Sequence, residues 1–139
     1  MVPVDATIQK KFEVDLECHN MSPLLAAVAE SGSDLNIVIL DACRNNPFKG
    51  FRSQARGLAI MNVPVGSILI YATAPGMVAE DGDGDNGVFT AMFLKHIMTT
   101  RLTIEEILKR ARFDVVQATG GQQVPWESSS MIGDFYFNR

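Results

Sequence analysis

The sequence has few of the residues that indicate disulfide-linked or metal-binding proteins. It contains only two cysteines and two histidines among 139 residues. Cys18 and Cys43 do not make a disulfide framework of the kind found in small secreted domains. Neither His19 nor His96 lies at metal-ligand spacing from a pair of cysteines. We therefore expect neither a disulfide scaffold nor a zinc site.

Long hydrophobic runs and an excess of positive charge are also missing. No apolar run approaches the roughly 18 residues that a membrane span needs, and Met1 is not followed by the regions of a signal peptide. The 12 Lys and Arg are outnumbered by 16 Asp and Glu, which gives a net charge of -4. We expect no membrane segment in this chain and no nucleic-acid partner.

The hydrophobic content is sufficient for a packed core. Apolar residues make up 47% of the chain, and a chain of 139 residues is typical of one domain. We therefore treat residues 1–139 as a single unit without internal repeats.

One apolar run ends in residues that could carry chemistry. Leu35 to Leu40 is a continuous run rich in β-branched residues, which is typical of a strand buried on both faces of a parallel sheet. Asp41, Ala42 and Cys43 follow it directly. Functional groups in open α/β sheets collect just past the carboxyl ends of strands. Cys43 is therefore a candidate nucleophile, and an ordinary buried cysteine is the alternative.

The rest of the chain alternates between helical and strand patterns. Ser22-Pro23 is a typical helix start and Gly32 a typical end. Thr103-Ile-Glu-Glu106 is a capping box. The further expected elements are a strand at 67–72, a helix at 88–98, a helix from Thr103 to Gly120, a last strand near 134–137, and short strands at 1–6 and 58–61. The apolar stripe that faces the core in the helix after Thr103 is expected to be Ile104, Ile107, Leu108, Ala111 and Val115.

Several of these segments resemble a known family. Asp41-Ala-Cys43-Arg-Asn-Asn-Pro-Phe48 resembles the nucleophile motif of bacterial caspase-like peptidases, which are relatives of the metacaspases in the caspase clan. The resemblance continues through four segments: Tyr-Ala-Thr-Ala-Pro-Gly at 71–76, the acidic Gly-rich loop at 81–87, Gln-Val-Pro-Trp-Glu-Ser-Ser-Ser at 123–130, and Gly-Asp-Phe-Tyr-Phe at 133–137. It implies a three-layer α/β/α caspase-like fold.

The resemblance also implies a chemistry. The Cys43 thiolate would attack a peptide carbonyl and form an acyl-enzyme thioester, which water then hydrolyses. The backbone N–H of Cys43 would help to form the oxyanion hole. A working thiolate favours a reducing compartment, so we expect a cytoplasmic protein.

Asp41 is the expected specificity residue. It lies two positions before Cys43, so on an extended backbone both side chains point to the same side. Metacaspases have an aspartate at this position that binds a cationic side chain, and the resemblance therefore implies cleavage after Arg or Lys. The alternative role for Asp41 is to cap backbone N–H groups near the strand end.

The acidic loop offers a second candidate. Asp81, Asp83 and Asp85 alternate with glycines, which suggests calcium, but the EF-hand pattern fails. Asn86 stands where its glycine belongs, and Met92 occupies the position of its bidentate glutamate. Asp83 is a candidate second acid of the substrate pocket, and a solvated, helix-capping loop is the alternative. We expect no cofactor, with calcium left as an alternative.

The catalytic histidine of the family is not matched in this sequence. In the family it lies in a His-Gly motif in the amino-terminal half of the domain, and only about three of the family's roughly six strands are expected here. The resemblance gives His19 no catalytic counterpart, and His96 lies on an apolar helical face where a packing role is expected. Trp126 either walls a substrate groove or packs on the core. We therefore expect the chain to be the C-terminal portion of the domain, a processed fragment or a truncated piece, with a His-bearing N-terminal fragment as partner.

Two further hypotheses follow from the sequence. Lys49, Arg52 and Arg56 lie just downstream of Cys43, so a protease that cuts after basic residues could process itself there. The alternative function is a catalytically inactive caspase-like interaction or scaffold module. An unrelated α/β hydrolase or amidotransferase is disfavoured, because the nucleophile lacks the flanking glycines of a nucleophile elbow.

Overall fold

The structure is a computed structural model that describes residue 13 and residues 20–42, 63–82 and 84–139. The described residues contain three helices and three strands. In chain order they are α2 (Ser22–Glu30), β1 (Asn36–Leu40), β2 (Ser67–Tyr71), α3 (Val88–Ile97), α4 (Ile104–Ala118) and β3 (Trp126–Ser129).

The three strands form one mixed sheet in the order β1-β2-β3. β1 and β2 are parallel and β2 and β3 are antiparallel. Every residue of the central strand β2 is buried, as its apolar run predicted. In β1 only Leu40 is fully buried, and Ile39 is 40% exposed. The prediction that β1 is buried on both faces is therefore wrong for the described residues, because only β2 borders it there.

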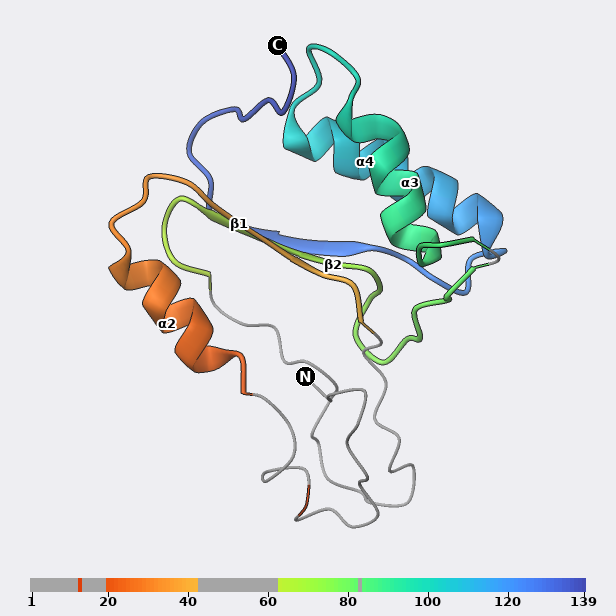
Figure 1. Cartoon of the computed structure of the whole chain (residues 1–139), viewed down its shortest axis with the longest axis horizontal. Helices are drawn as coiled ribbons and strands as arrows, with labels where there is room; N and C mark the ends of the chain where they lie inside the picture. The colour runs from red at the N-terminus through yellow and green to blue at the C-terminus, as the bar shows by residue number, and fades with distance from the viewer. Residues whose placement is uncertain (1–12, 14–19, 43–62, 83) are drawn as a thin grey trace.

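Helices cover both faces of the sheet (Figure 1). On one face, Leu25 of α2 packs with Leu40, Leu69 and Tyr71. On the other, α3 and α4 pack on the alternate residues of β2, and this larger cluster includes Ile68, Ile70, Phe89, Ile107 and Val115. Successive side chains of a strand point to opposite faces, so β2 supplies both cores. The expected three-layer α/β/α arrangement is confirmed.

The helix α4 forms as its sequence predicted. The Thr103 hydroxyl accepts from the backbone N–H of Glu106 at 3.2 Å, and the Glu106 carboxylate accepts from the backbone N–H of Thr103 at 2.8 Å, so the capping box is complete. The five buried residues of α4 are the predicted stripe: Ile104, Ile107, Leu108, Ala111 and Val115. After the helix, Gly120 and Gly121 adopt positive φ angles of 58° and 84°, which glycine tolerates best.

The start of α2 differs from its prediction. Ser22 is the first helical residue and Met21 occupies the N-cap, without a side-chain hydrogen bond. The side-chain oxygen of Asn20 instead accepts from the backbone N–H of Ser22 at 2.9 Å. The side chain of Asn20 therefore caps the first N–H of the helix, whereas the sequence predicted that Ser22 itself would be the N-cap.

The last strand also differs from its prediction. It forms at Trp126–Ser129, and residues 134–137 contribute only an isolated bridge between Tyr136 and Thr103. The apolar alternation of that segment has another cause. The rings of Phe135 and Phe137 meet edge to face with centroids 5.0 Å apart, and Phe137 meets Phe93 at 6.1 Å. The segment therefore packs against the helices instead of joining the sheet.

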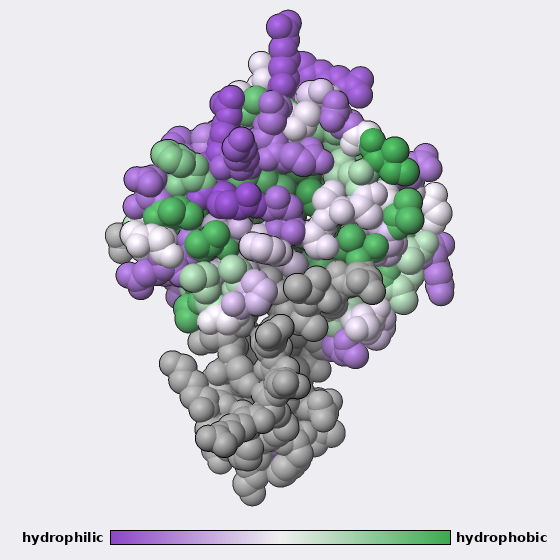
Figure 2. Space-filling model, turned by 180° about the vertical axis from the view of Figure 1, so that it is seen from behind, coloured by the Kyte–Doolittle hydropathy of each residue, from purple (hydrophilic) through white to green (hydrophobic). Residues whose placement is uncertain are grey.

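The molecular surface mixes polar and apolar residues. On the face in Figure 2, hydrophobic side chains lie in separate small groups between hydrophilic ones, so its described residues form no single apolar band. None of the described helices has both the length and the hydropathy that a membrane crossing requires.

Candidate functional site

The carboxyl ends of the two parallel strands lie next to each other. Leu40 is in register with Tyr71, and the backbone N–H of Ala72 donates to the carbonyl of Leu40 at 3.0 Å. The segments that leave β1 and β2 therefore begin side by side. This edge of the sheet is where an α/β protein places its functional groups.

Cys43, the predicted nucleophile, lies outside the described residues. The structure describes the two residues before it, Asp41 and Ala42, directly after the end of β1. The first part of the Asp-Ala-Cys motif thus lies at the carboxyl edge of the sheet. The role of Cys43 remains a prediction.

Asp41 contacts the beginning of α3. Its side chain is exposed, and its Oδ2 atom accepts a hydrogen bond from the hydroxyl of Thr90, although the two residues are 49 positions apart. Gly87, the N-cap of α3, lies so close that a Cβ built on it would be 3.2 Å from the same oxygen. The carboxylate therefore rests against the first turn of α3.

The electrostatics of this contact favour a negative charge. The N-terminus of a helix carries a partial positive charge from its unpaired N–H groups. Gly87, the N-cap of α3, has no side chain that could cap the helix, and the first turn contains no acidic residue. Asp41, which directly follows β1, places a carboxylate at a helix end that has no acidic residue in its own first turn. The hydrogen bond found comes from a threonine hydroxyl, not from the backbone N–H groups that we considered for a capping role.

The sequence contains one local signal for a role of Thr90. The first turn of α3 is Val88-Phe89-Thr90-Ala91, and Thr90 is its only hydrogen-bonding side chain. A lone hydroxyl in an apolar first turn is a reason to look for a partner. The partner itself could not be found by pattern, because Asp41 lies 49 positions earlier, after β1.

The acidic loop closes at its base, while Asp83 lies outside the described residues. The backbone N–H of Val88 donates to the carbonyl of Glu80 at 3.0 Å, so the two ends of the loop meet. Gly82 adopts a φ of +71°, and a Cβ there would be 3.2 Å from the Val88 side chain. Among the residues that the structure describes, no group of three or more His, Cys, Asp or Glu could hold a metal ion. The role of Asp83 stays a prediction.

Gln123 connects the loop to the strand ends. It is fully buried, its Nε2 donates to the carbonyl of Ala72 at 2.9 Å, and its Oε1 accepts from the backbone N–H of Glu80 at 2.9 Å. Its own N–H donates to the hydroxyl of Thr119 at 3.0 Å. One amide thus holds both ends of the segment that follows β2. In the sequence Gln123 is part of the motif at 123–130, and nothing local predicts its partners.

The remaining sequence candidates have different outcomes. His19 lies outside the described residues. His96 is largely buried on α3, as expected for a packing histidine, and its Nε2 lies 2.9 Å from Oδ2 of Asp114 on α4.

Trp126 is 47% exposed and belongs to neither buried cluster, so the alternative in which it packs on the core is wrong. It pairs with Tyr71 at the same edge of the sheet as Asp41.

Asp114 lies in a cluster of charged side chains that lowers its pKa. Lys95 Nζ donates to its Oδ2 at 2.7 Å, and His96 contacts the same oxygen. The hydrogen bonds from Lys95 and His96 hold the pKa of Asp114 below its ordinary value. This cluster joins α3 to α4, and His96 lies about 9 Å along α3 from Thr90 at a rise of about 1.5 Å per residue. It is a structural ion-pair cluster, separate from the Asp41 contact.

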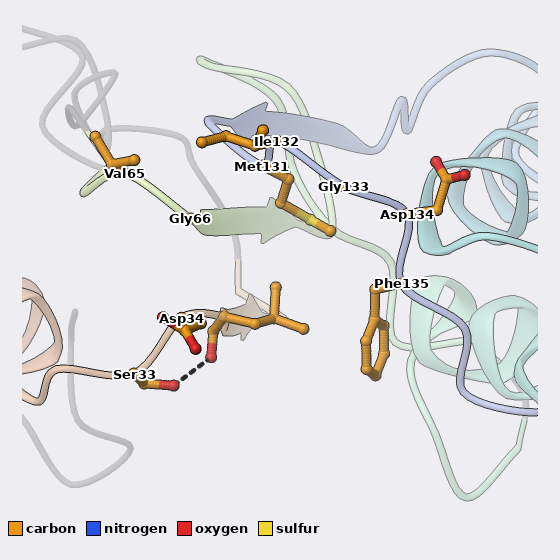
Figure 3. Close-up of a pocket in the computed structure, with 10 residues that line it drawn as sticks. Ser33, Asp34, Val65, Gly66, Met131, Ile132, Gly133, Asp134 and Phe135 are labelled. Carbon is orange, nitrogen blue, oxygen red and sulfur yellow. Dashed lines mark hydrogen bonds between the residues drawn. The ribbon is translucent and has the colours of Figure 1, made fainter.

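A cavity of about 410 Å³ lies at the opposite edge of the sheet. Its walls come from the residues just before β1, those just before β2 and the segment after β3 (Figure 3). Figure 3 shows the side chains of Asp134 and Phe135 on opposite sides of the chain. The cavity is thus separated from Asp41 by the length of the strands.

Comparison with known proteins places these features in a family. A model of the caspase domain family matches residues 1–136. A search of curated proteins found no significant match. Among solved structures, caspase-1 from Spodoptera frugiperda is similar, with a TM-score of 0.53 and 16% sequence identity. The match covers 73% of this chain and 45% of that one, so this chain spans less than half of that caspase. At this sequence identity, the comparison shows that the two proteins share a fold.

Proposed function

This chain belongs to the caspase domain family, and we propose that it supplies the nucleophile and the specificity carboxylate of a cysteine endopeptidase. The proposed enzyme hydrolyses peptide bonds after Arg or Lys. The observation that carries the proposal is the position of Asp41, an exposed carboxylate at the carboxyl edge of the sheet, two residues before Cys43 and held against α3.

The proposed reaction has two steps. The Cys43 thiolate forms a bond to the carbonyl carbon of the substrate, and the C–N bond breaks as the amine leaves with a proton from an imidazolium. Water then attacks the thioester, gives its proton to the imidazole and releases the carboxylic acid and the thiolate. We propose that the imidazole comes from a His-Gly segment in the amino-terminal part of the domain. General acid–base help of this kind typically contributes about 10²–10⁴-fold.

The chemistry of Asp41 supports a basic residue before the cleaved bond. A carboxylate pairs with a guanidinium through two parallel hydrogen bonds and with an ammonium through one. Asp41 is exposed, and only its Oδ2 has a hydrogen-bond partner among the described residues. Asp83 remains our candidate for a second acid in the same pocket. The basic residues Lys49, Arg52 and Arg56 are the proposed sites of self-processing.

The experiment uses the complete protein that contains this chain. Peptides that release a fluorophore after Arg, Lys or Asp are incubated with wild type, Cys43→Ala and Asp41→Asn. Cys43→Ala should abolish cleavage. Asp41→Asn should lower kcat/KM for Arg peptides about 10- to 100-fold, which corresponds to about 1.5–3 kcal/mol for a hydrogen bond to a charged group. Asp34→Asn is the matched control, because it removes an exposed carboxylate before the other end of β1.

Other outcomes would contradict the proposal. Cleavage after Asp instead of Arg would remove the argument for the Asp41 pocket. No cleavage by the complete protein would favour the inactive interaction module. Self-processing is tested separately by mapping new termini in the wild type and in Cys43→Ala, and identical fragments from both would refute it.

A further inference from the structure

We propose that Thr90 is a positioning residue that orients the Asp41 carboxylate and thereby favours Arg over Lys. The inference rests on the proposed function, because it concerns the same pocket. Thr90 itself is not expected to touch the substrate. Its hydroxyl donates to Oδ2 of Asp41 and so restrains the carboxylate from a second element of the fold.

The restraint is effective because the first turn of α3 is itself fixed. Phe89, the neighbour of Thr90, is 1% exposed and lies in the core between α3 and β2. It stacks with Phe93, one turn later, with ring centroids 5.8 Å apart. Buried aromatic anchors on a helix hold the position of the turn that carries them. Thr90 therefore presents its hydroxyl from a rigid base.

Gly87 leaves space for the carboxylate of Asp41 at the start of α3. A Cβ at this position would lie 3.2 Å from Oδ2 of Asp41 and 3.5 Å from the carbonyl oxygen of Glu80. A contact of 3.2 Å is tighter than ordinary van der Waals separation, so a side chain there would displace the carboxylate. The absence of a side chain at the N-cap lets Asp41 approach the positive end of α3.

This geometry distinguishes the two basic side chains. A carboxylate offers about four lone-pair sites on two oxygens, so Oδ2 can accept from Thr90 and still accept from a ligand. A guanidinium is a rigid planar fork that needs both oxygens in its plane, whereas an ammonium is a compact charge that needs one. Fixing the rotation of the carboxylate therefore benefits Arg more than Lys. Free rotation after loss of Thr90 would reduce that difference.

The test compares three variants in the complete protein. Thr90→Val keeps the shape and removes the donor, Thr90→Ser restores the donor, and Thr100→Val removes an exposed hydroxyl from the loop after α3. We expect Thr90→Val to lower kcat/KM for Arg peptides about tenfold, as loss of one hydrogen bond to a charged group would. The loss for Lys peptides should be about two- to threefold. The change should lie mainly in KM, because binding and not chemistry is altered.

The controls separate positioning from general destabilisation. Thr90→Ser should restore the Arg-to-Lys ratio, and Thr100→Val should match the wild type. Thr90→Val should retain most of its resistance to urea. If the substitution instead reduced the amount of folded protein, kcat would fall equally for Arg and Lys peptides.

Two kinds of failure can be told apart. If the wild type cleaves Arg peptides through Cys43 but Thr90→Val leaves the Arg-to-Lys ratio unchanged, the inference about Thr90 is wrong and the proposed function stands. If the wild type cleaves neither Arg nor Lys peptides, the proposed function is wrong and the inference falls with it.

Discussion

The side-chain amide of Gln123 donates to the backbone carbonyl of Ala72 at 2.9 Å, across 51 positions of the chain. Its oxygen accepts from the N–H of Glu80 at 2.9 Å. A single buried side chain thus joins the end of β2 to the base of the acidic loop. Val88, the first residue of α3, donates its N–H to the carbonyl of the same Glu80 at 3.0 Å, so these hydrogen bonds link Gln123 to the start of α3.

Gln123→Leu should destabilise the protein by about 2–4 kcal/mol. The change leaves the carbonyl of buried Ala72 unsatisfied, which costs about 1–3 kcal/mol, and removes the partner of the partly buried N–H of Glu80, which adds about 1 kcal/mol. Urea unfolding followed by circular dichroism measures the loss. Gln122→Leu is the matched control, since Gln122 is exposed and its side chain makes no hydrogen bond with a described residue. Equal stability of the two variants would contradict this account.

Ile107→Ala should cost about 2–5 kcal/mol. Ile107 is fully buried between α4 and the sheet, and its truncation leaves a cavity that the packed core closes only in part. Phe113→Ala on the same helix is the control, because Phe113 is 64% exposed. That change should stay within about 0.5 kcal/mol. A larger loss for Phe113→Ala than for Ile107→Ala would mean that α4 packs through its other face.

Thr103→Ala should lower stability by about 0.5–2 kcal/mol, the usual value of an N-cap. It removes the hydroxyl that accepts from the N–H of Glu106 at 3.2 Å and opens the capping box. Thermal unfolding would measure the shift. Thr100→Ala, outside the helix, serves as comparison, and Thr103→Ser should retain most of the stability because it keeps the hydroxyl.

The pH dependence of stability should include a contribution from Asp114. In the folded state its pKa is held below the ordinary value of an aspartate, because Lys95 and His96 donate hydrogen bonds to it. A group whose pKa is depressed on folding stabilises the protein above its unfolded pKa and loses that effect as the pH falls through the folded one. The difference in stability between wild type and Asp114→Asn should therefore be present at pH 6 and shrink below about pH 4.

Urea unfolding at several pH values, with Asp34→Asn as control, checks this expectation. Asp34 is exposed, and its carboxylate makes no hydrogen bond or ion pair with a described residue. A stability difference between wild type and Asp114→Asn that grows as the pH falls would have the wrong sign and would contradict the role of Lys95 and His96.

Local physics accounts for the elements that the sequence predicted well. The capping box at Thr103, the apolar stripe of α4, and the helix from Val88 are all encoded within a few turns of one segment. The apolar run at Ser67–Tyr71 likewise predicted a strand, and β2 forms there. Where a residue's structure depends on neighbours three or four positions away, the pattern determines the outcome.

The site was predictable only in outline. The sequence indicated that Asp41 follows a strand at the functional edge of the sheet, and the structure describes it there. Cys43 and Asp83 lie outside the described residues and remain predictions. The β1 run alone could not tell that Ile39 is 40% exposed, because burial depends on which strands and helices surround it.

What the sequence determined by itself is the set of locally encoded elements and the order of its motifs. Only the tertiary structure decided that the last strand is Trp126–Ser129 and that Phe135 and Phe137 pack near Phe93. It also decided that Thr90 holds Asp41 and that Gln123 holds Ala72, across 49 and 51 positions. A hydroxyl or an amide has many possible partners in sequence, and only the packed sheet and helices bring one of them within hydrogen-bonding distance.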